Sequence, residues 1–278
     1  MNVKDQHILT IIQTRRGSSR LPDKVLMPLQ NKPLFVRQVE RVQAARFSGR
    51  VVIATTTCEE DDLIVDICHR EGLDCYRGHP QDLLDRHYQA ALEFGADTVI
   101  KIPSDCPLID PAIIDHVIGY WLEHDYDFVS NLHPATWPDG NDVEIMTLPA
   151  LEKAWRESGR SMEREHTTPY IWEHPEIFRI GNVIMEGGKD YSMTHRFTID
   201  YEADYQLIRA VFDELYPMDR LFGLESILDL LSKRPELFSI NADLAGVNWY
   251  RHHLGELRTV GAAQTKQPAP DRAKIHTL

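Results

Sequence analysis

Residues 13–24 of the sequence, QTRRGSSRLPDK, hold several cations in one short polar segment. Gly17 and Ser18 can turn tightly and offer backbone N–H groups and a hydroxyl to an anion. Arg20 suits a bidentate contact with a phosphate group, and Lys24 adds a point charge. A hydrogen bond to a charged group contributes roughly 1.5–3 kcal/mol, so two or three of them would matter for holding a triphosphate. The segment is a candidate phosphate-binding loop, although a solvated surface turn with scattered salt bridges fits the same residues.

Two aspartates follow apolar runs that have the pattern of strands. Asp105 lies in KIPSDCPLIDP, directly after residues 97–103, and Asp200 lies in RFTIDYEAD, at the end of residues 195–200. A carboxylate at the end of a strand suits Mg²⁺, a hard cation that prefers oxygen ligands and is shared with substrate phosphates. Two such aspartates at one sheet edge could bind the same metal ion. Capping of a turn by Asp105 and of the next helix by Asp200 are the competing interpretations.

Further polar side chains gather in the middle of the sequence. Asp142 and Glu144 alternate with Val143 in DGNDVE, so both are expected on one face of a strand, which faces either solvent or a polar substrate pocket. Glu165 and His166 in EHTTPY form another polar cluster. A histidine of this kind is more often structural or surface-exposed than functional.

The first half of the chain alternates short β-branched runs with amphipathic helical stretches. The predicted strands are 7–12, 50–56, 97–103 and 126–131, and the predicted helices are 31–47, 59–72, 82–95 and 111–124. This alternation predicts an α/β fold, in which a mainly parallel sheet is covered by helices on both faces through right-handed crossovers. Ligands of such sheets bind beyond the carboxyl ends of the strands. The basic segment and Asp105 are therefore expected at the same edge of the sheet.

The second half of the chain is less regular. Strands are predicted at 141–147 and 195–200, and helices at 148–158 and 201–216. Residues 255–278 lack apolar periodicity and are predicted to form a flexible tail.

The composition narrows the class of protein. Of the 278 residues, 42% are hydrophobic and 26% are charged, as is ordinary for a soluble globular protein. The formal net charge is −13, yet residues 1–50 hold ten Lys and Arg against three Asp and Glu. A net-acidic chain is a poor candidate for binding long nucleic acid, whereas a local basic patch suits a small polyanion.

Location also follows from the sequence. No apolar run reaches the length of a membrane span, so no contact with a membrane is predicted, and the first residues lack the pattern of a secretory signal. The four cysteines form no CxxC pair and follow no metal-ligand spacing. A cytoplasmic protein with reduced thiols is the resulting prediction.

Two familiar nucleotide-binding loops are absent from the sequence. There is no GxxxxGK[ST], which argues against a P-loop kinase or ATPase, and no GxGxxG after the first predicted strand, which argues against a dinucleotide site.

Taken together and in this order, these motifs resemble the cytidylyltransferase family that makes CMP-activated sugars. The branch most similar is that of spore-coat polysaccharide biosynthesis protein F, and the CMP-sialic acid and CMP-ketodeoxyoctulosonate synthetases are more distant. The resemblance covers about residues 7–215 and rests on QTRRGSSRLPDK, ATTTCEEDD, RGHPQDLLDRHYQAA, KIPSDCPLIDP, PDGNDVE, EHTTPY and RFTIDYEAD.

This resemblance implies a Rossmann-like nucleotidyltransferase fold over residues 1–254, with an acceptor-site or dimerisation subdomain at about 135–190, and a homodimer. It implies Mg²⁺-dependent attack of an acceptor oxygen on the α-phosphate of CTP, with release of pyrophosphate. The implied acceptor is a sugar or sugar-like acid used in polysaccharide or surface glycan biosynthesis. A phosphorylated non-sugar metabolite as acceptor, or a non-catalytic nucleotide-binding protein, are the alternatives.

Roles for individual residues follow from the same resemblance. Catalysis would fall to Arg20, Lys24 and Asp105, and metal binding to Asp105 and Asp200. Nucleotide binding would involve Gln13, Arg15, Gly17, Ser18, Arg20, Lys24, Ala54, Thr55, Gly78, Asp82, Arg86 and Asp105. The acceptor would face Asp142, Glu144, Glu165 and His166.

One departure from the family pattern affects the site. Where the family commonly has Arg and Thr-Gly before the metal-binding aspartate, this chain has Lys101, Pro103 and Ser104. Because a lysine cannot make the bidentate contact of an arginine, the affinity for the nucleotide or its identity is expected to differ.

Overall fold

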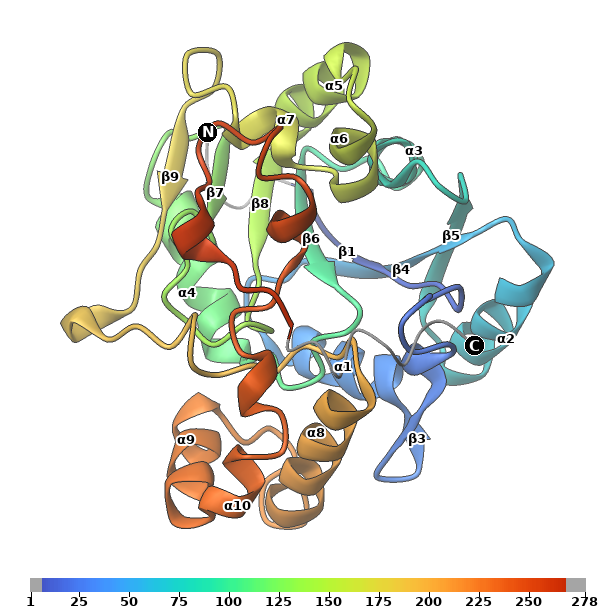
Figure 1. Cartoon of the computed structure of the whole chain (residues 1–278). Coiled ribbons are helices and arrows are strands. Elements are labelled where there is room, and N and C mark those ends of the chain that lie inside the picture. The colour runs from blue at the N-terminus through green and yellow to red at the C-terminus, as the bar shows by residue number, and fades with distance from the viewer. Residues whose placement is uncertain (1–6, 269–278) are drawn as a thin grey trace.

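The computed structural model describes residues 7–268 and contains a seven-stranded sheet in the order β5-β4-β1-β6-β8-β7-β9 (Figure 1). The strands are β1 (Ile8–Gln13), β4 (Arg50–Thr56), β5 (Asp74–Gly78), β6 (Thr98–Pro103), β7 (Phe128–Ser130), β8 (Glu144–Thr147) and β9 (Ile180–Asn182). Strand β8 runs antiparallel to both of its neighbours, and the other pairs are parallel. The predicted α/β class with a mainly parallel sheet is confirmed.

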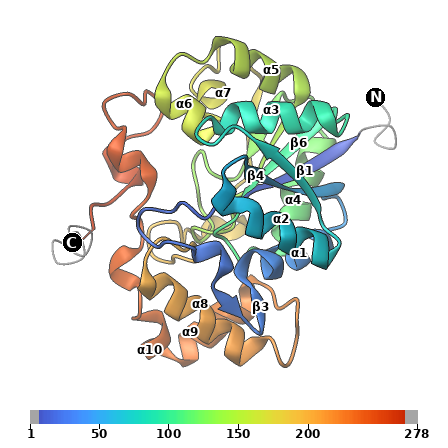
Figure 2. The ribbon, with the colours of Figure 1, turned by 90° about the vertical axis from the view of Figure 1, so that its right-hand side faces the viewer.

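Helices cover both faces of this sheet, as Figure 2 shows from the side. They are α1 (Leu34–Ala44), α2 (Asp62–Glu71), α3 (Leu83–Glu93), α4 (Pro111–Leu122), α5 (Leu148–Glu157), α6 (Ser161–His166), α7 (Pro169–Trp172), α8 (Glu202–Leu215), α9 (Leu224–Lys233) and α10 (Pro235–Phe238). A short hairpin of β2 (Pro28–Leu29) and β3 (Lys32–Pro33) precedes α1.

Alternating side chains of the strands form two hydrophobic cores. On β6, Ile100 and Ile102 pack with residues of α1, α4 and α8, whereas Val99 packs on the opposite face with residues of α3, α5 and α7. Because side chains alternate along a strand, Lys101 projects into the second layer with Val99. That charge therefore lies on the side of the sheet covered by α3 and α7, where Glu144 on β8 is its partner in register.

Two of the sequence predictions need correction at the level of elements. Residues 195–200 form no strand; Phe197 and Ile199 are buried, but their N–H groups donate to the carbonyls of Asp139 and Asp105 at 2.6 and 2.9 Å. Strand β5 was not predicted, because its sequence DCYRG has no β-branched residue and it forms a half-exposed sheet edge.

The region 135–190 is built into the main sheet. It supplies β8 and β9 as well as α5, α6 and α7, and after β9 the chain extends away from the sheet in a loop (Figure 1). Its part in dimerisation or acceptor binding stays a prediction.

The end of the described chain, residues 244–268, is here named the C-terminal strap. It runs from the α8–α10 region to α7 and back, in front of the sheet in Figure 1 and at the left in Figure 2. Leu257 and Val260 are buried, and Glu173 after α7 accepts hydrogen bonds from the backbone of Arg258 and Thr259 at 2.7 and 2.9 Å. The described part of the predicted tail at 255–278 thus packs against the domain. Residues 269–278 lie outside the described residues, and the flexibility of the tail stays a prediction.

Within residues 7–268, no helix is both long enough and apolar enough to span a bilayer.

Candidate active site

The basic loop that follows β1 is held in shape by one of its own arginines. The Arg16 side chain donates to Asp23 at 2.7 Å and to the carbonyl of Glu60 at 2.9 Å, while its backbone N–H donates to Asp61 at 2.9 Å. The sequence motifs assigned no binding or catalytic role to Arg16. These contacts fix the path of the loop, leave Gly17 exposed and set Ser18 half-buried within it.

Lys24 leads from this loop into the centre of the site. Its ammonium group donates to Asp105 at 2.7 Å, to Asp200 at 3.0 Å and to the carbonyl of Ile199 at 2.6 Å. Burial disfavours the charged ammonium, but the two carboxylates outweigh that cost and raise the pKa of Lys24. The loop and the two aspartates predicted for one sheet edge are therefore in direct contact.

Asp200 lies among three cations. It accepts from Arg20 at 2.5 Å, from Lys24, and from Arg196 at 2.9 Å. Burial alone would raise its pKa, but Lys24, Arg196 and Arg20 together hold the pKa of Asp200 far below its usual range. Asp200 does not cap the following helix, because Tyr201 occupies the N-cap position of α8, and Asp204 in the first turn accepts from the backbone N–H groups of Asp200 and Tyr201.

Arg196 supports this centre from behind and was not found from the sequence. Its side chain is 1% exposed and pairs with Asp139 at 3.0 Å, Asp200 at 2.9 Å and Asp204 at 3.1 Å. A buried guanidinium of this kind orients all three carboxylates at once.

The two aspartates that were predicted to bind metal converge on one point. Oxygens of Asp105 and Asp200 both lie within hydrogen-bonding distance of the Lys24 nitrogen, so a cation already lies between them. No group of three His, Cys, Asp or Glu side chains with metal-binding geometry occurs within residues 7–268. Two carboxylates fit Mg²⁺, which usually takes one or two protein carboxylates and completes its shell with water and phosphate oxygens.

The ends of β1 and β4 lie side by side next to the loop. Gln13 pairs in register with Ala54, and Thr55 follows on the same strand. The side-chain oxygens of Gln13 and Thr55 are buried without a hydrogen-bond partner among the described residues. Because such groups are costly to bury unpaired, they are available to a polar ligand at this edge.

A second group of predicted nucleotide-binding residues shapes the neighbouring loop at residues 79–80. Arg86 is buried and donates to the carbonyl of His79 at 2.7 Å and of Pro80 at 2.9 Å. Burial, together with the nearby charge of Arg15, lowers the pKa of Arg86 to about 10. A Cβ atom on Gly78 would lie 2.8 Å from the Arg86 side chain, so glycine permits this close approach.

The remaining residue of this group, Asp82, has two structural contacts. It accepts from the backbone N–H of Asp85 at 2.8 Å and so caps α3, and it pairs with Arg164 at 3.3 Å. The exposed Arg15 stays on the open side of the loop.

On the expected acceptor side, Glu144 is buried and satisfied. It forms an ion pair with Lys101 and accepts from Thr168 at 2.5 Å. Asp142, two residues earlier, has no cationic partner among the described residues, and burial raises its pKa to about 6. The two carboxylates predicted to share a face therefore differ, with Glu144 locked in a pair and Asp142 available.

His166 and Glu165 end helix α6 with different surroundings. The His166 ring stacks on Trp249 of the strap with centroids 3.8 Å apart, and burial, with the charge of Lys101, lowers the pKa of His166 to about 3. Glu165 is exposed. His133 stacks on Trp172 at 4.3 Å, and its pKa is likewise lowered by burial, to about 4. Both imidazoles are therefore neutral at pH 7.

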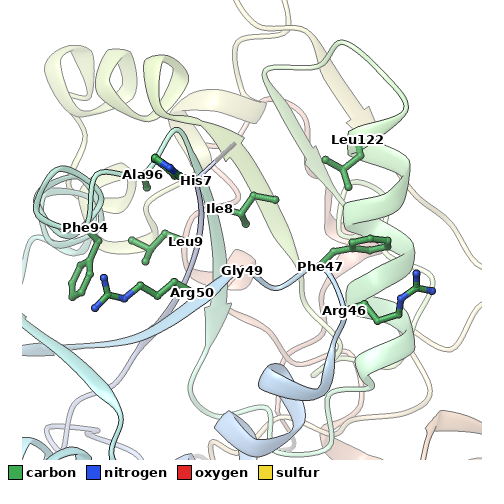
Figure 3. Close-up of a pocket in the computed structure, with 10 residues that line it drawn as sticks. All are labelled: His7, Ile8, Leu9, Arg46, Phe47, Gly49, Arg50, Phe94, Ala96 and Leu122. Atoms are coloured by element: carbon green, nitrogen blue, oxygen red, sulfur yellow. The ribbon is translucent and has the colours of Figure 1, made fainter. Parts of the chain in front are cut away.

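Figure 3 shows a cavity of about 540 Å³ lined by His7, Ile8, Leu9, Arg46, Phe47, Gly49, Arg50, Phe94, Ala96 and Leu122. It lies at the start of β1, at the opposite end of the strand from the basic loop. None of the residues predicted to bind nucleotide, metal or acceptor lines it.

The mainly parallel sheet, with β8 reversed inside it, and the charged loop after β1 form the nucleotidyltransferase fold that a related cytidylyltransferase structure shares. Residues 9–243 match the family described as cytidylyltransferase, and the chain belongs to this family. The resemblance drawn from the sequence motifs is confirmed.

Individual relatives support the same family. The chain is 34% identical over 242 residues to an uncharacterised protein of Methanocaldococcus jannaschii, covering 85% of this chain and 95% of the relative. It is 30% identical to the spore coat polysaccharide biosynthesis protein SpsF of Bacillus subtilis, covering 82% and 95%. A cytidylyltransferase structure from Leptospira borgpetersenii superposes with a TM-score of 0.79 at 31% identity, covering 84% of this chain and 97% of that one.

Proposed function

We propose that this enzyme is a Mg²⁺-dependent cytidylyltransferase that transfers CMP from CTP to a sugar or sugar-like acid and releases pyrophosphate. The observation that carries the proposal is the contact of Lys24 with both Asp105 and Asp200, beside Arg20, at the end of β1. This arrangement offers carboxylates for a divalent cation and side chains for a triphosphate at one point. The similarity to SpsF supports a role in polysaccharide biosynthesis.

In this proposal, the loop after β1 receives the triphosphate. Gly17 offers its backbone N–H group and Ser18 its hydroxyl, and Arg15 and Arg20 offer guanidinium groups to phosphate oxygens, whereas the Ser18 N–H donates to the carbonyl of Arg16 at 2.7 Å. The unpaired oxygens of Gln13 and Thr55 would meet polar atoms of the base or ribose. Arg86, Asp82 and Gly78, together with Ala54, would shape that pocket through the adjacent loop.

Asp105 and Asp200 would hold Mg²⁺. When bound, the ion would neutralise charge on the phosphates. Since Lys24 contacts both carboxylates, its ammonium group would have to shift for these carboxylates to hold the ion. The released ammonium is then free to contact the phosphate that undergoes substitution. Lys24 would stabilise the negative charge that develops there, and Arg20 the negative charge that develops on the departing pyrophosphate.

The acceptor would approach from the side of Asp142, Glu165 and His166. Its hydroxyl oxygen forms a bond to the α-phosphorus while the bond to pyrophosphate breaks, and the hydroxyl proton must be taken up. Asp142 is ionised at pH 7 and has no cationic partner among the described residues, so it is the group proposed to accept this proton. Glu144 would support the wall of the pocket through Lys101 and Thr168. A homodimer and a cytoplasmic location belong to the same proposal.

The proposal is tested with purified protein, Mg²⁺, each of the four nucleoside triphosphates, and a panel of sugar acids and phosphorylated metabolites. The expected result is pyrophosphate release that requires CTP, with a new CMP adduct in the mass spectrum. Asp105→Asn should abolish release, whereas Asp229→Asn, on the exposed face of α9, should not. Full activity of Asp105→Asn would contradict the metal assignment, and CTP binding without turnover of any acceptor in the panel or an extract would contradict the transfer reaction.

A further inference from the structure

The C-terminal strap lies beyond the part of the chain that matches the family. The match ends at residue 243, whereas the strap comprises residues 244–268. Motifs carried over from the family therefore assign no residue to it. Figure 2 nevertheless shows the strap on the same side of the molecule as the loop after β1.

Contacts at both ends hold the strap to the site. The carbonyl of Val247 accepts a hydrogen bond from Arg196 at 2.5 Å, and Arg196 in turn pairs with Asp200. At the far end, Glu173 is fully buried and binds the backbone of Arg258 and Thr259. The strap thus spans from the charged centre to α7.

Internal contacts fix the turn between these ends, which is the short helix η6 (Trp249–His252). The Asn248 side chain caps it by accepting from the N–H of Tyr250 at 3.1 Å and donates to the carbonyl of Gln264 at 2.8 Å. Trp249 stacks on His166. The turn is therefore held next to His166 and Arg196.

Arg251 is the cation that this turn carries. Its guanidinium donates to the carbonyl of Asn248 at 2.6 Å, and no carboxylate within residues 7–268 forms an ion pair with it. It lies within electrostatic range of Arg20, Asp200 and Arg196. Burial lowers the pKa of Arg251, and repulsion from Arg20 and Arg196 acts in the same direction, whereas Tyr201 and Asp200 act against it. A half-buried guanidinium beside another one is stabilised by an anion that contacts both.

Arg20 also has a hydrogen-bond donor without an acceptor. One of its terminal nitrogens binds Asp200, but its Nε is buried and has no hydrogen-bond partner among the described residues. The Arg20 side chain is 36% exposed, against 11% for Lys24, so Arg20 lies on the outer side of the site. Unfilled donors on the outer side suit the terminal phosphates of a nucleotide rather than the reacting one.

We propose that the strap supplies Arg251 as a further nucleotide-binding residue, which acts with Arg20 on the β- and γ-phosphates of the triphosphate, the part that leaves as pyrophosphate. This assignment rests on the proposed cytidylyltransferase function. It places a residue from outside the family match in the substrate site, and it makes the strap part of the enzyme's binding surface.

The test compares the affinities of Arg251→Met, Arg251→Lys and the wild-type protein by calorimetry. The ligands are CTP with Mg²⁺, inorganic pyrophosphate, and CMP, which lacks the two terminal phosphates. Loss of a charged hydrogen bond predicts binding of CTP and pyrophosphate about tenfold to a hundredfold weaker in Arg251→Met, with CMP changed less than threefold. Arg251→Lys, which keeps the charge but not the fork, should lie between. Arg220→Met, an exposed arginine before α9, is the matched control and should bind all three as the wild type does.

Two results would overturn the assignment. One is a CTP and pyrophosphate affinity of Arg251→Met within twofold of the wild type. The other is an equal loss for CMP and CTP, which would show that the substitution disturbs the strap as a whole. If the wild type bound pyrophosphate but not CTP, the proposed nucleotide would be wrong, and the pyrophosphate measurement would still decide the role of Arg251.

Discussion

Replacing Arg196 by methionine tests whether one buried guanidinium holds the charged centre together. The wild-type side chain is 1% exposed and contacts Asp139, Asp200 and Asp204, of which Asp204 is fully buried. Methionine fills a similar volume but leaves these carboxylates without that partner. Breaking a buried pair by removing one member costs about 3–5 kcal/mol, so we expect the free energy of unfolding to fall by that amount. Urea unfolding followed by circular dichroism measures it.

The pH dependence of this loss provides a second readout. In the wild type, the pKa of Asp200 is depressed, so its contribution to stability is present above its unfolded pKa and is lost as the pH falls through its folded value. Asp139 has a pKa that burial raises to about 8 despite Arg196, and removal of Arg196 raises it further. A raised carboxylate pKa favours the folded state as the pH falls. Because Asp139 is protonated in both folded proteins below pH 8, the deficit of Arg196→Met relative to the wild type should shrink as the pH falls toward 8 from above and then stay nearly constant down to pH 5.

A matched control separates burial from charge. Arg209→Met removes an arginine that is 63% exposed and pairs with Asp213 across one helical turn at 3.7 Å, and such a pair is worth about 0.5 kcal/mol or less. Stability of Arg196→Met within about 1 kcal/mol of the wild type would refute the reasoning, as would a deficit that does not change as the pH rises above 8.

Three further predictions concern the site and the strap. Lys24→Met should lower kcat by about a hundredfold or more. Without nucleotide, the variant should bind Mn²⁺ more tightly than the wild type, because Asp105 and Asp200 lose the ammonium group that lies between them. Titration followed by electron paramagnetic resonance measures the Mn²⁺ affinity, and an unchanged affinity would contradict the idea that Lys24 and the metal ion occupy the same position. In the wild type, kcat should fall as the pH drops through about 6, the pKa of Asp142, since only the carboxylate accepts a proton. Asp142→Asn should have a lower kcat that no longer falls in this pH range. If kcat of the variant still falls there, another group causes the pH dependence. Glu173→Ala should release the strap from α7. Limited proteolysis followed by mass spectrometry should then find faster cleavage within residues 255–268 than in the wild type. Equal cleavage rates would contradict the role of Glu173 in holding the strap.

Much of the fold was accessible from the sequence because its first half repeats a clear pattern. Strand β4 was predicted with its observed bounds at 50–56, and the basic loop was placed after β1 at the same edge as Asp105. These predictions succeed because buried parallel strands are continuous apolar runs and because their carboxyl ends must share an edge. The direction of β8 was not predictable, since hydrophobic alternation carries no information on strand polarity.

The errors have a common physical origin in long-range contacts. Residues 195–200 have the apolar alternation of a strand, but their backbone groups bond to Asp139 and Asp105 in loops far away in sequence. The hydrogen bond from the N–H of Ile199 to the carbonyl of Asp105 brings Asp200 close to Asp105. The two aspartates are therefore neighbours as predicted, although not because both follow strands of the sheet.

Arg196 and Arg251 were missed for the same reason. An arginine in a mixed polar sequence gives no sign that it is buried, and no motif extends to the strap. Likewise, the positions of Lys24, Asp105 and Asp200 in the sequence do not reveal that their side chains are in contact in the folded chain. The sequence signal that could have pointed to Arg196 is its place in RFTIDYEAD, where Asp200 and Asp204 follow at helical spacing.

The position of the strap has a practical consequence for handling the protein. The described chain enters the fold at His7, at the start of β1, while the loop that contacts Lys24 and Asp105 begins after Gln13, roughly 20 Å further along that strand. At the other end, residue 268 directly continues the segment that carries Arg251. An affinity tag or a surface-attachment group at the N-terminus therefore enters at the sheet edge remote from the nucleotide. An addition directly after residue 268 would follow the segment that carries Arg251, so immobilisation and binding assays should attach the protein ahead of His7.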